Sequence, residues 1–177
     1  IDEKKRTFLV TSPGFSEGKA TTVVNLAVSM AQQDKKVLVI DADIRKPAIQ
    51  YVFKTNSAVG LTNVLEGEKT IAEAVHATEI AHVSVLPSGP IPLNAAELVG
   101  SKSMEKLIQT ALEQFDVILF DSSPVLEVTA TRMLASQCDG VLLVLQSGKT
   151  GKERAVQAKK ALEFSKATVL GVILNQK

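Results

Sequence analysis

A lysine and a nearby glycine stand where a phosphate ester could be bound. The stretch Ser12–Thr22 reads SPGFSEGKATT and leads from an apolar run into residues with helical spacing. A strand, a glycine-containing turn and a helix N-terminus direct several backbone N–H groups at one point, where a phosphate can sit within reach of Lys19. The stretch predicts a phosphate-binding loop. An ordinary strand-to-helix turn with a solvated lysine is the alternative.

This loop departs from the usual pattern GxxxxGK[ST] at two places. Pro13 stands at the first glycine position, with Gly14 beside it, and Ala20 follows the lysine in place of Ser or Thr. The missing hydroxyl is the group that normally ligates Mg²⁺ in phosphate-loop enzymes. We therefore expect weaker Mg²⁺ binding, and Thr21 could supply an oxygen only if the helix started at a shifted position.

Three aspartates follow apolar runs that are typical of buried strands. Asp41 and Asp43 come after Val37–Ile40, and Asp121 comes after Val117–Phe120. In open α/β sheets the ligand binds beyond the carboxyl ends of the strands, so these side chains should meet at one edge. Paired carboxylates there can hold Mg²⁺, directly or through water, and can accept a proton from an attacking hydroxyl. A turn in which the aspartates accept local backbone N–H groups is the alternative.

The elements that must position these residues are short buried strands joined by helices. Six runs are rich in Val, Ile and Leu and do not alternate with polar residues, which is typical of strands buried on both faces. They are Thr7–Thr11, Val37–Ile40, Val83–Leu86, Val117–Phe120, Gly140–Leu145 and Val169–Leu174. Amphipathic stretches lie between them, notably after residue 19 and over Ser103–Gln114 and Gly151–Phe164. The alternation predicts an α/β fold, a doubly wound, mostly parallel sheet flanked by helices.

Composition excludes several classes of protein. The 177 residues suit one domain, and 20 Lys and Arg against 19 Asp and Glu give a net charge of +1. This balance gives no global attraction to nucleic acid, and 4% aromatic residues without Trp argue against a base-stacking platform. The single cysteine, Cys138, cannot form an internal disulfide, and no apolar run approaches the roughly 18–20 residues of a membrane span.

Three longer segments carry a more specific pattern. Ile40–Pro47 reads IDADIRKP, Gly60–Leu65 reads GLTNVL, and Ser88–Leu98 reads SGPIPLNAAEL. In these segments, and in the final strand Gly171–Asn175, the chain resembles the cytoplasmic kinase domain of bacterial protein-tyrosine kinases. This Walker-motif family controls capsule and exopolysaccharide synthesis. The resemblance covers nearly the whole chain.

The resemblance implies an ATP-dependent protein-tyrosine kinase with a P-loop NTPase fold that binds ATP or ADP and Mg²⁺. By position, the catalytic residues would be Lys19, Asp41 and Asp43, and the metal would lie among Asp41, Asp43 and Asp121. The nucleotide would contact Glu17, Gly18, Lys19, Ala20, Thr21 and Asn175. The Asn175 amide could hydrogen-bond a purine edge, although an Asn in a turn at a strand end is as common.

The resemblance also implies partners. Family members phosphorylate a tyrosine-rich C-terminal tail in trans and form homo-oligomers through an N-terminal helix. A membrane modulator of the polysaccharide co-polymerase type activates them at the inner face of the cell membrane. We expect residues 1–177 to be a single kinase core without that helix and tail, cytoplasmic and peripheral to the membrane through its partner. Tyrosine-containing proteins, not nucleic acid, would be its substrates, and Tyr51, the one tyrosine, should be a partly buried ring.

Departures from the family pattern keep two other functions open. Phe15 and Ser16 replace Pro-Gly, Ser122-Ser123 replace Thr-Pro, and Ala130 stands where the family has Asp. Together with Ala20, these changes favour a catalytically weak nucleotide-binding regulatory module as one alternative. A partition-type (ParA/MinD-like) ATPase is the other, opposed by Gly14, which stands where those proteins carry a second lysine.

Overall fold

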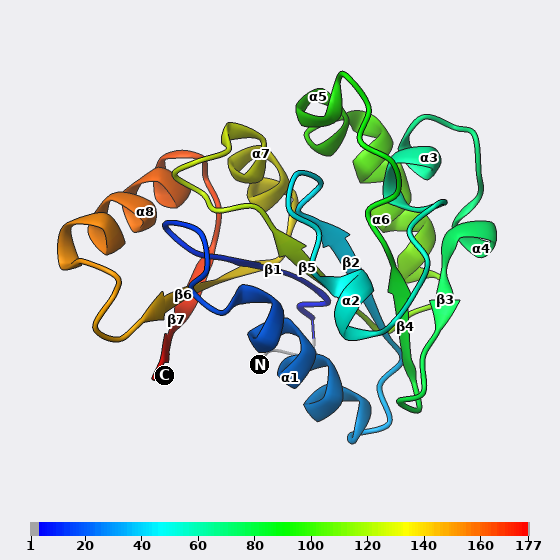
Figure 1. The fold of residues 1–177 in the computed structure, drawn as a ribbon, viewed down its shortest axis with the longest axis horizontal. Coiled ribbons are helices and arrows are strands. Elements are labelled where there is room, and N and C mark those ends of the chain that lie inside the picture. The colour runs from blue at the N-terminus through cyan, green and yellow to red at the C-terminus, as the bar shows by residue number, and fades with distance from the viewer. Residues whose placement is uncertain (1–3, 177) are drawn as a thin grey trace.

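The computed structural model describes residues 4–176, and a sheet of seven strands runs through their centre (Figure 1). The strands lie in the order β3-β4-β2-β5-β1-β6-β7, and every neighbouring pair is parallel except β3 with β4. This arrangement confirms the predicted doubly wound, mostly parallel sheet. The strands are β1 Thr7–Thr11, β2 Val37–Ala42, β3 His76–Ala77, β4 Val83–Leu86, β5 Val117–Ser122, β6 Gly140–Gln146 and β7 Val169–Asn175.

Helices cover both faces of the sheet (Figure 1). They are α1 Lys19–Ala31, α2 Ile49–Val52, α3 Leu61–Leu65, α4 Ile71–Ala74, α5 Ala95–Val99, α6 Lys102–Leu112, α7 Thr129–Gln137 and α8 Lys152–Phe164. Helices α1 and α2 pack on one face, and α6, α7 and α8 pack on the other. The inner strands therefore have an apolar layer above and below them. The edge strand β7 differs from the expectation, because Leu170, Val172 and Leu174 are exposed on one face.

The central strand β1 shows why the apolar runs are continuous. Phe8 and Val10 pack into the core beneath α1, whereas Leu9, between them, packs into the core beneath α6 and α7. All three side chains are at most 1% exposed. Burying such a side chain contributes about 1.5–3 kcal/mol, so both faces of the strand favour this position in the sheet.

Several elements escaped prediction because they are short or weakly apolar. Strand β3 has two residues, and α2, α3, α4 and α5 have four or five, too few for a periodic pattern to show. Helix α7 has nine residues, but its sequence TATRMLASQ contains only two large apolar side chains. Within the described part of the chain, every helix falls short of the length and apolar character that a membrane span needs.

Two segments that are distant in sequence meet where α3 begins. The N–H groups of Leu61 and Thr62 donate to the carbonyl oxygens of Pro87 (2.7 Å) and Ser88 (3.1 Å). A Cβ atom on Gly60 would lie 2.2 Å from the Pro87 oxygen, so only glycine fits there. The GLTNVL segment and the start of the SGPIP segment therefore form one packed joint.

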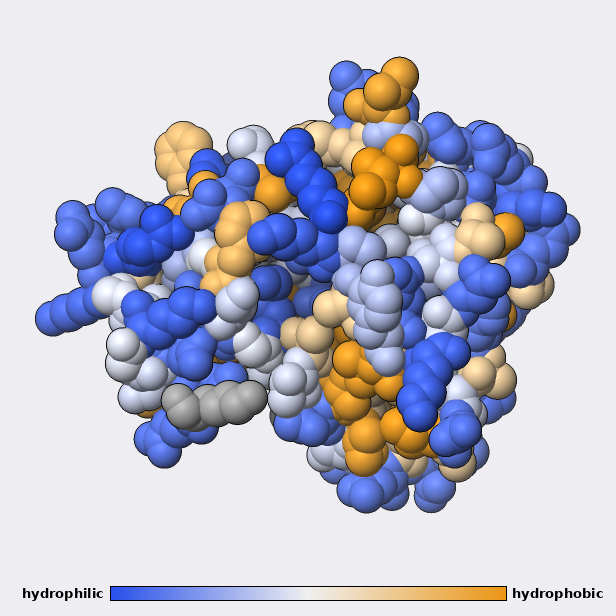
Figure 2. All heavy atoms as spheres, viewed as in Figure 1, coloured by the Kyte–Doolittle hydropathy of each residue, from blue (hydrophilic) through white to orange (hydrophobic). Residues whose placement is uncertain are grey.

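The surface is mostly hydrophilic on the face that Figure 2 shows. Apolar side chains gather there in two areas, one beside α5 and one between α1 and the lower end of β4. Exposed Ile91 and Leu93 lie just before α5, and exposed Val52 belongs to α2. Tyr51, also on α2, is 74% exposed. The expectation of a partly buried ring is wrong, because this one-turn helix buries only Ile49 against the sheet.

Candidate active site

The carboxyl ends of β1, β2 and β5 bring most of the predicted site residues together. The register of β2 and β5 places Asp41 directly beside Asp121. In front of them lies a pocket of about 230 Å³ between the β1–α1 loop and the β2–α2 loop. Its lining includes Glu17, Gly18, Lys19, Ala20, Thr21, Asp43 and Asp121. Seven of the predicted site residues therefore share one pocket, whereas Asn175 and the fully buried Asp41 do not line it. Their individual roles stay predictions.

The β1–α1 loop has the geometry of an anion site. Helix α1 begins at Lys19, and its N-cap, Gly18, has φ 91°, a left-handed conformation that glycine adopts readily. No side chain caps this end, so the first N–H groups of a 13-residue helix are left to donate to a ligand. The Lys19 side chain is 8% exposed and lines the same pocket. These features fit a bound phosphate.

Asn175 reaches this loop from the last strand. A Cβ atom on Gly18 would lie 2.2 Å from Nδ2 of Asn175, so the amide sits directly against the loop. The backbone oxygen of Asn175 accepts a hydrogen bond from the N–H of Ser147 (2.8 Å). The structure thus places Asn175 beside the predicted phosphate site, and its contact with a purine stays a prediction.

Asp41, near the end of β2, and Asp43, just after it, both shape the β2–α2 turn. Asp41 accepts the N–H groups of Asp43, Ala48 and Ile49, each at 3.1 Å. Asp43 accepts the hydroxyl of Ser123 through Oδ1 (2.9 Å). The alternative of local backbone bonding is therefore observed. These bonds leave both carboxylates with free acceptor positions. Within the described residues, Oδ1 of Asp41 accepts one donor and Oδ2 of Asp43 accepts none.

Asp121 is the least satisfied of the three carboxylates. It is 2% exposed, and its buried Oδ1 has no hydrogen-bond partner within the described residues. Burial raises the pKa of Asp121 to about 7, opposed by the nearby Lys19 ammonium and assisted by Asp43. Burial and the neighbouring Asp121 also raise the pKa of Asp41 well above its usual value. Buried carboxylates this close together are stabilised when one of them is protonated or when a cation binds between them.

A magnesium ion fits this site only with oxygens from outside the protein. Within residues 4–176, no three His, Cys, Asp or Glu side chains form a ready-made metal-ligand group. Phosphate oxygens and water would have to complete the coordination, as is usual for Mg²⁺. The orphaned Oδ1 of Asp121 fits such a cation, whereas Ala20 offers no oxygen. Because α1 starts at Lys19, the helix start is not shifted and Thr21 does not take over the position of Ala20.

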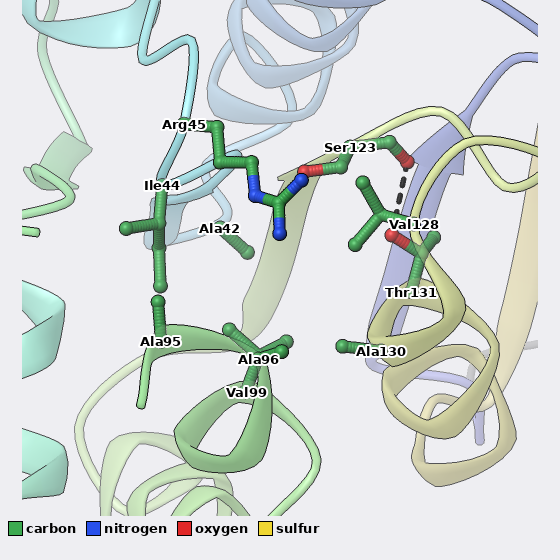
Figure 3. A pocket seen from close by; sticks show the side chains of 10 residues that line it. All are labelled: Ala42, Ile44, Arg45, Ala95, Ala96, Val99, Ser123, Val128, Ala130 and Thr131. Atoms are coloured by element: carbon green, nitrogen blue, oxygen red, sulfur yellow. Dashed lines mark hydrogen bonds between the residues drawn. The ribbon is translucent and has the colours of Figure 1, made fainter. Parts of the chain in front are cut away.

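A second pocket adjoins the carboxylates on the side of α5 and α7 (Figure 3). Figure 3 shows Arg45 extending toward Ser123, with Ala96 on α5 and Ala130 on α7 facing the same space. Even with small side chains at these positions, the space is only about 20 Å³, room for about one water molecule. Because Ser123 also donates to Asp43, this pocket and the phosphate pocket share one wall.

Lys149, Thr150 and Arg154 contact the phosphate loop and were missed in the sequence. Lys149 donates to the carbonyl oxygens of Phe15 and Ser16, and the Thr150 hydroxyl donates to the Glu17 carboxylate. These contacts cross more than 130 residues of chain, so no local pattern could have shown them.

Comparison with known proteins identifies the family. A family model described as an AAA domain matches residues 15–168. Tyrosine-protein kinase YwqD of Bacillus subtilis is 46% identical over 177 residues, which are 100% of this chain and 75% of that protein. The chain belongs to the bacterial tyrosine-protein kinases. The resemblance seen in its motifs is thus confirmed.

Solved structures agree with this family. The crystal structure of the VpsO kinase domain matches with a TM-score of 0.95 at 32% identity, covering 100% of this chain and 87% of that one. The septum site-determining protein MinD of Pyrococcus horikoshii, complexed with Mg-ADP, has a TM-score of 0.77 at 23% identity. That match covers 96% of this chain and 70% of MinD and shows a shared fold alone.

Asp121→Asn is expected to stabilise the ligand-free domain more at pH 8 than at pH 5. A carboxyl whose pKa is raised to about 7 keeps its proton in the fold while the unfolded chain, near 3.8, releases it. Stability from this group is therefore fully present below about pH 3.8 and is lost progressively as pH rises from there to about 7. Asparagine removes the buried charge, and we expect a melting temperature at least about 3 °C higher at pH 8.

Thermal unfolding followed by circular dichroism at both pH values checks this result. Glu113→Gln, which removes an exposed carboxylate far from the site, is the matched control. An equal shift at pH 5 and pH 8 would contradict the assignment of a raised pKa to Asp121.

Proposed function

We propose that this chain is an ATP-dependent protein-tyrosine kinase core that transfers the γ-phosphoryl group of ATP to a tyrosine hydroxyl. The observation that carries the proposal is the pairing of Asp41 with Asp121 in register, beside a phosphate loop that contains the buried Lys19. The chain is 46% identical to a tyrosine-protein kinase over its 177 residues, and this similarity supports the same reaction.

In this proposal the phosphates, the base and the metal are held by different groups, and Asp41 has a second task as proton acceptor. Lys19 and the N–H groups from Glu17 to Thr21 hold the phosphates of ATP or ADP, and Asn175 lies near the base. Asp43 and Asp121, with Asp41, would hold Mg²⁺ directly or through water. Bound Mg²⁺ would supply positive charge that neutralises the phosphate oxygens and the departing ADP.

Asp41 is the proposed proton acceptor. Its pKa is raised by burial and by Asp121, which brings its basicity closer to that needed near neutral pH. As the tyrosine oxygen forms its bond to the γ-phosphorus, the phenolic proton passes to Asp41. The bond from the γ-phosphorus to the bridging oxygen breaks, and its electron pair leaves with ADP.

A regulatory module is the second candidate because of Ala20. If the missing hydroxyl leaves Mg²⁺ too weakly held for transfer, the domain would bind nucleotide and switch a partner without phosphorylating it. A partition-type ATPase is opposed by Gly14, whose N–H is already bound by Glu17 (2.9 Å) and which carries no side chain to reach a neighbouring nucleotide.

Cellular context is also part of the proposal. Membership of the tyrosine-kinase family supports a role in capsule or exopolysaccharide synthesis, with a membrane modulator of the co-polymerase type as activator. We propose that the full-length protein forms a homo-oligomer in the cytoplasm, at the inner face of the membrane through that modulator. The core covers residues 1–177 and acts on tyrosine-containing proteins.

Transfer of radiolabelled phosphate from ATP to a tyrosine-containing peptide tests the kinase activity. We expect incorporation that requires Mg²⁺, that is absent from the same peptide with phenylalanine at the tyrosine, and that falls at least about 100-fold in Asp41→Asn. ATP binding without incorporation would favour the regulatory module. Incorporation that is unaffected by Asp41→Asn would remove Asp41 from the mechanism.

A further inference from the structure

The turn between β6 and α8 forms hydrogen bonds with the phosphate loop. Lys149 Nζ donates to the carbonyl oxygens of Phe15 (3.1 Å) and Ser16 (2.9 Å). The hydroxyl of Thr150 donates to the Glu17 carboxylate and accepts the N–H of Gln146 (2.9 Å). This one turn therefore contacts three consecutive residues of the loop.

The loop needs such support at Ser16. Its φ is 59°, in the left-handed region that residues with a Cβ atom adopt only at a cost. The two carbonyl groups bound by Lys149 belong to the peptide before Ser16 and the peptide after it. A single ammonium group thus holds both peptide planes that define the conformation of Ser16.

The same contacts orient two donors toward the pocket. In a trans peptide the N–H points opposite to the C=O, and the structure has no cis peptide bond within residues 4–176. Because the carbonyls of Phe15 and Ser16 face Lys149, the N–H groups of Ser16 and Glu17 face the other way. Neither N–H donates to another group in the described residues, and both residues line the phosphate pocket.

The loop is also held on both sides of Ser16. Arg154, on α8, donates to the carbonyl of Pro13 (3.3 Å) and pairs with Glu127 (2.9 Å). Glu17 is 4% exposed and accepts the N–H of Gly14 as well as the Thr150 hydroxyl. With these anchors in place, Ser16 is the position where the loop depends on Lys149.

We propose that Lys149 is a positioning residue for nucleotide binding. Its ammonium holds Ser16 in the left-handed conformation, and so keeps the N–H groups of Ser16 and Glu17 directed at the phosphates of a nucleoside di- or triphosphate. The inference rests on the proposed nucleotide site, but it assigns a role to a residue 133 positions from Ser16 that does not itself face the phosphates.

A double-mutant cycle separates this role from simple charge attraction. Glycine adopts the left-handed conformation without a Cβ penalty, so Ser16→Gly should make Lys149 dispensable. We expect Lys149→Met to weaken binding of Mg-ATP about tenfold, corresponding to about 1.4 kcal/mol. In the Ser16→Gly background, the same substitution should weaken binding by less than about threefold.

Calorimetric titration with Mg-ATP measures these affinities in the wild type, both single variants and the double variant. Lys152→Met, which removes an exposed lysine three residues further on, is the control and should bind like the wild type. Unchanged melting temperatures without nucleotide should show that Lys149→Met is folded, and Lys149→Gln should reproduce its loss of affinity. In a kinase assay, KM for ATP should rise while kcat changes by less than about twofold.

The outcomes distinguish the two proposals. If the wild type binds Mg-ATP and Lys149→Met binds it equally well, the positioning role is wrong and the proposed function stands. An equal loss with and without the Ser16→Gly substitution would show that Lys149 acts through its charge and would also overturn the positioning role. A wild-type chain that binds no nucleotide would overturn both proposals.

Discussion

Replacing Ala20 by serine is expected to raise Mg²⁺-dependent phosphoryl transfer by about 10–100-fold, equivalent to about 1.4–2.8 kcal/mol of barrier. Ala20 follows the first residue of α1 and lines the phosphate pocket, where a hydroxyl could reach a cation held by Asp121. The buried Oδ1 of Asp121 has no hydrogen-bond partner within the described residues and is free to accept such a cation. A serine oxygen would add the ligand that magnesium prefers.

Steady-state kinetics at varied Mg²⁺ concentration measure this gain. The Mg²⁺ concentration for half-maximal rate should fall in the serine variant, while ATP affinity without metal stays similar. Ala20→Cys is the matched control, because a thiol of nearly the same shape is a poor ligand for a hard cation. A serine variant no faster than the wild type would show that the alanine does not limit transfer.

Replacing Lys19 by methionine is expected to lower kcat/KM for ATP by at least about 100-fold, equivalent to about 2.8 kcal/mol. The ammonium is buried and is the cation that opposes the raised pKa of Asp121. Its removal takes a positive charge from the phosphates and leaves the carboxylates without their compensating neighbour. The loss should therefore appear in both nucleotide affinity and transfer rate.

Titration with ATP and single-turnover transfer separate these two losses. Lys102→Met removes an exposed lysine at the start of α6 and should leave both quantities unchanged. If Lys19→Met bound and transferred like this control, the β1–α1 loop would not be the phosphate site.

The sheet was predictable because its inner strands are buried on both faces, and the exposed edge strand β7 is still marked by its apolar run. All six apolar runs are strands in the structure, and β2 and β5 extend past the runs to include Asp41 and Asp121. Helices of four or five residues leave no such trace, since one turn holds too few side chains to form a periodic pattern. Their positions depend on contacts such as the buried Ile49 of α2, which the sequence does not mark.

The candidate site was predictable where strand ends converge and not where distant segments meet. Lys19 and the three aspartates follow strands that share an edge, so their proximity follows from the fold class. That Asp41 also holds the backbone of the β2–α2 turn requires the conformation of that turn. Lys149 reaches Ser16 only because β6 lies beside β1 in the sheet.

The joint at Gly60 links two segments through backbone atoms. Its fit against Pro87 leaves no room for a Cβ atom, and the Thr62 hydroxyl also donates to the Pro90 carbonyl (2.7 Å). The GLTNVL and SGPIP segments, in which the chain resembles the family, are thus constrained by their packing against each other. A chain that acquires a larger residue at Gly60 must first rebuild the path of Pro87–Gly89, so these segments should be inherited as a pair.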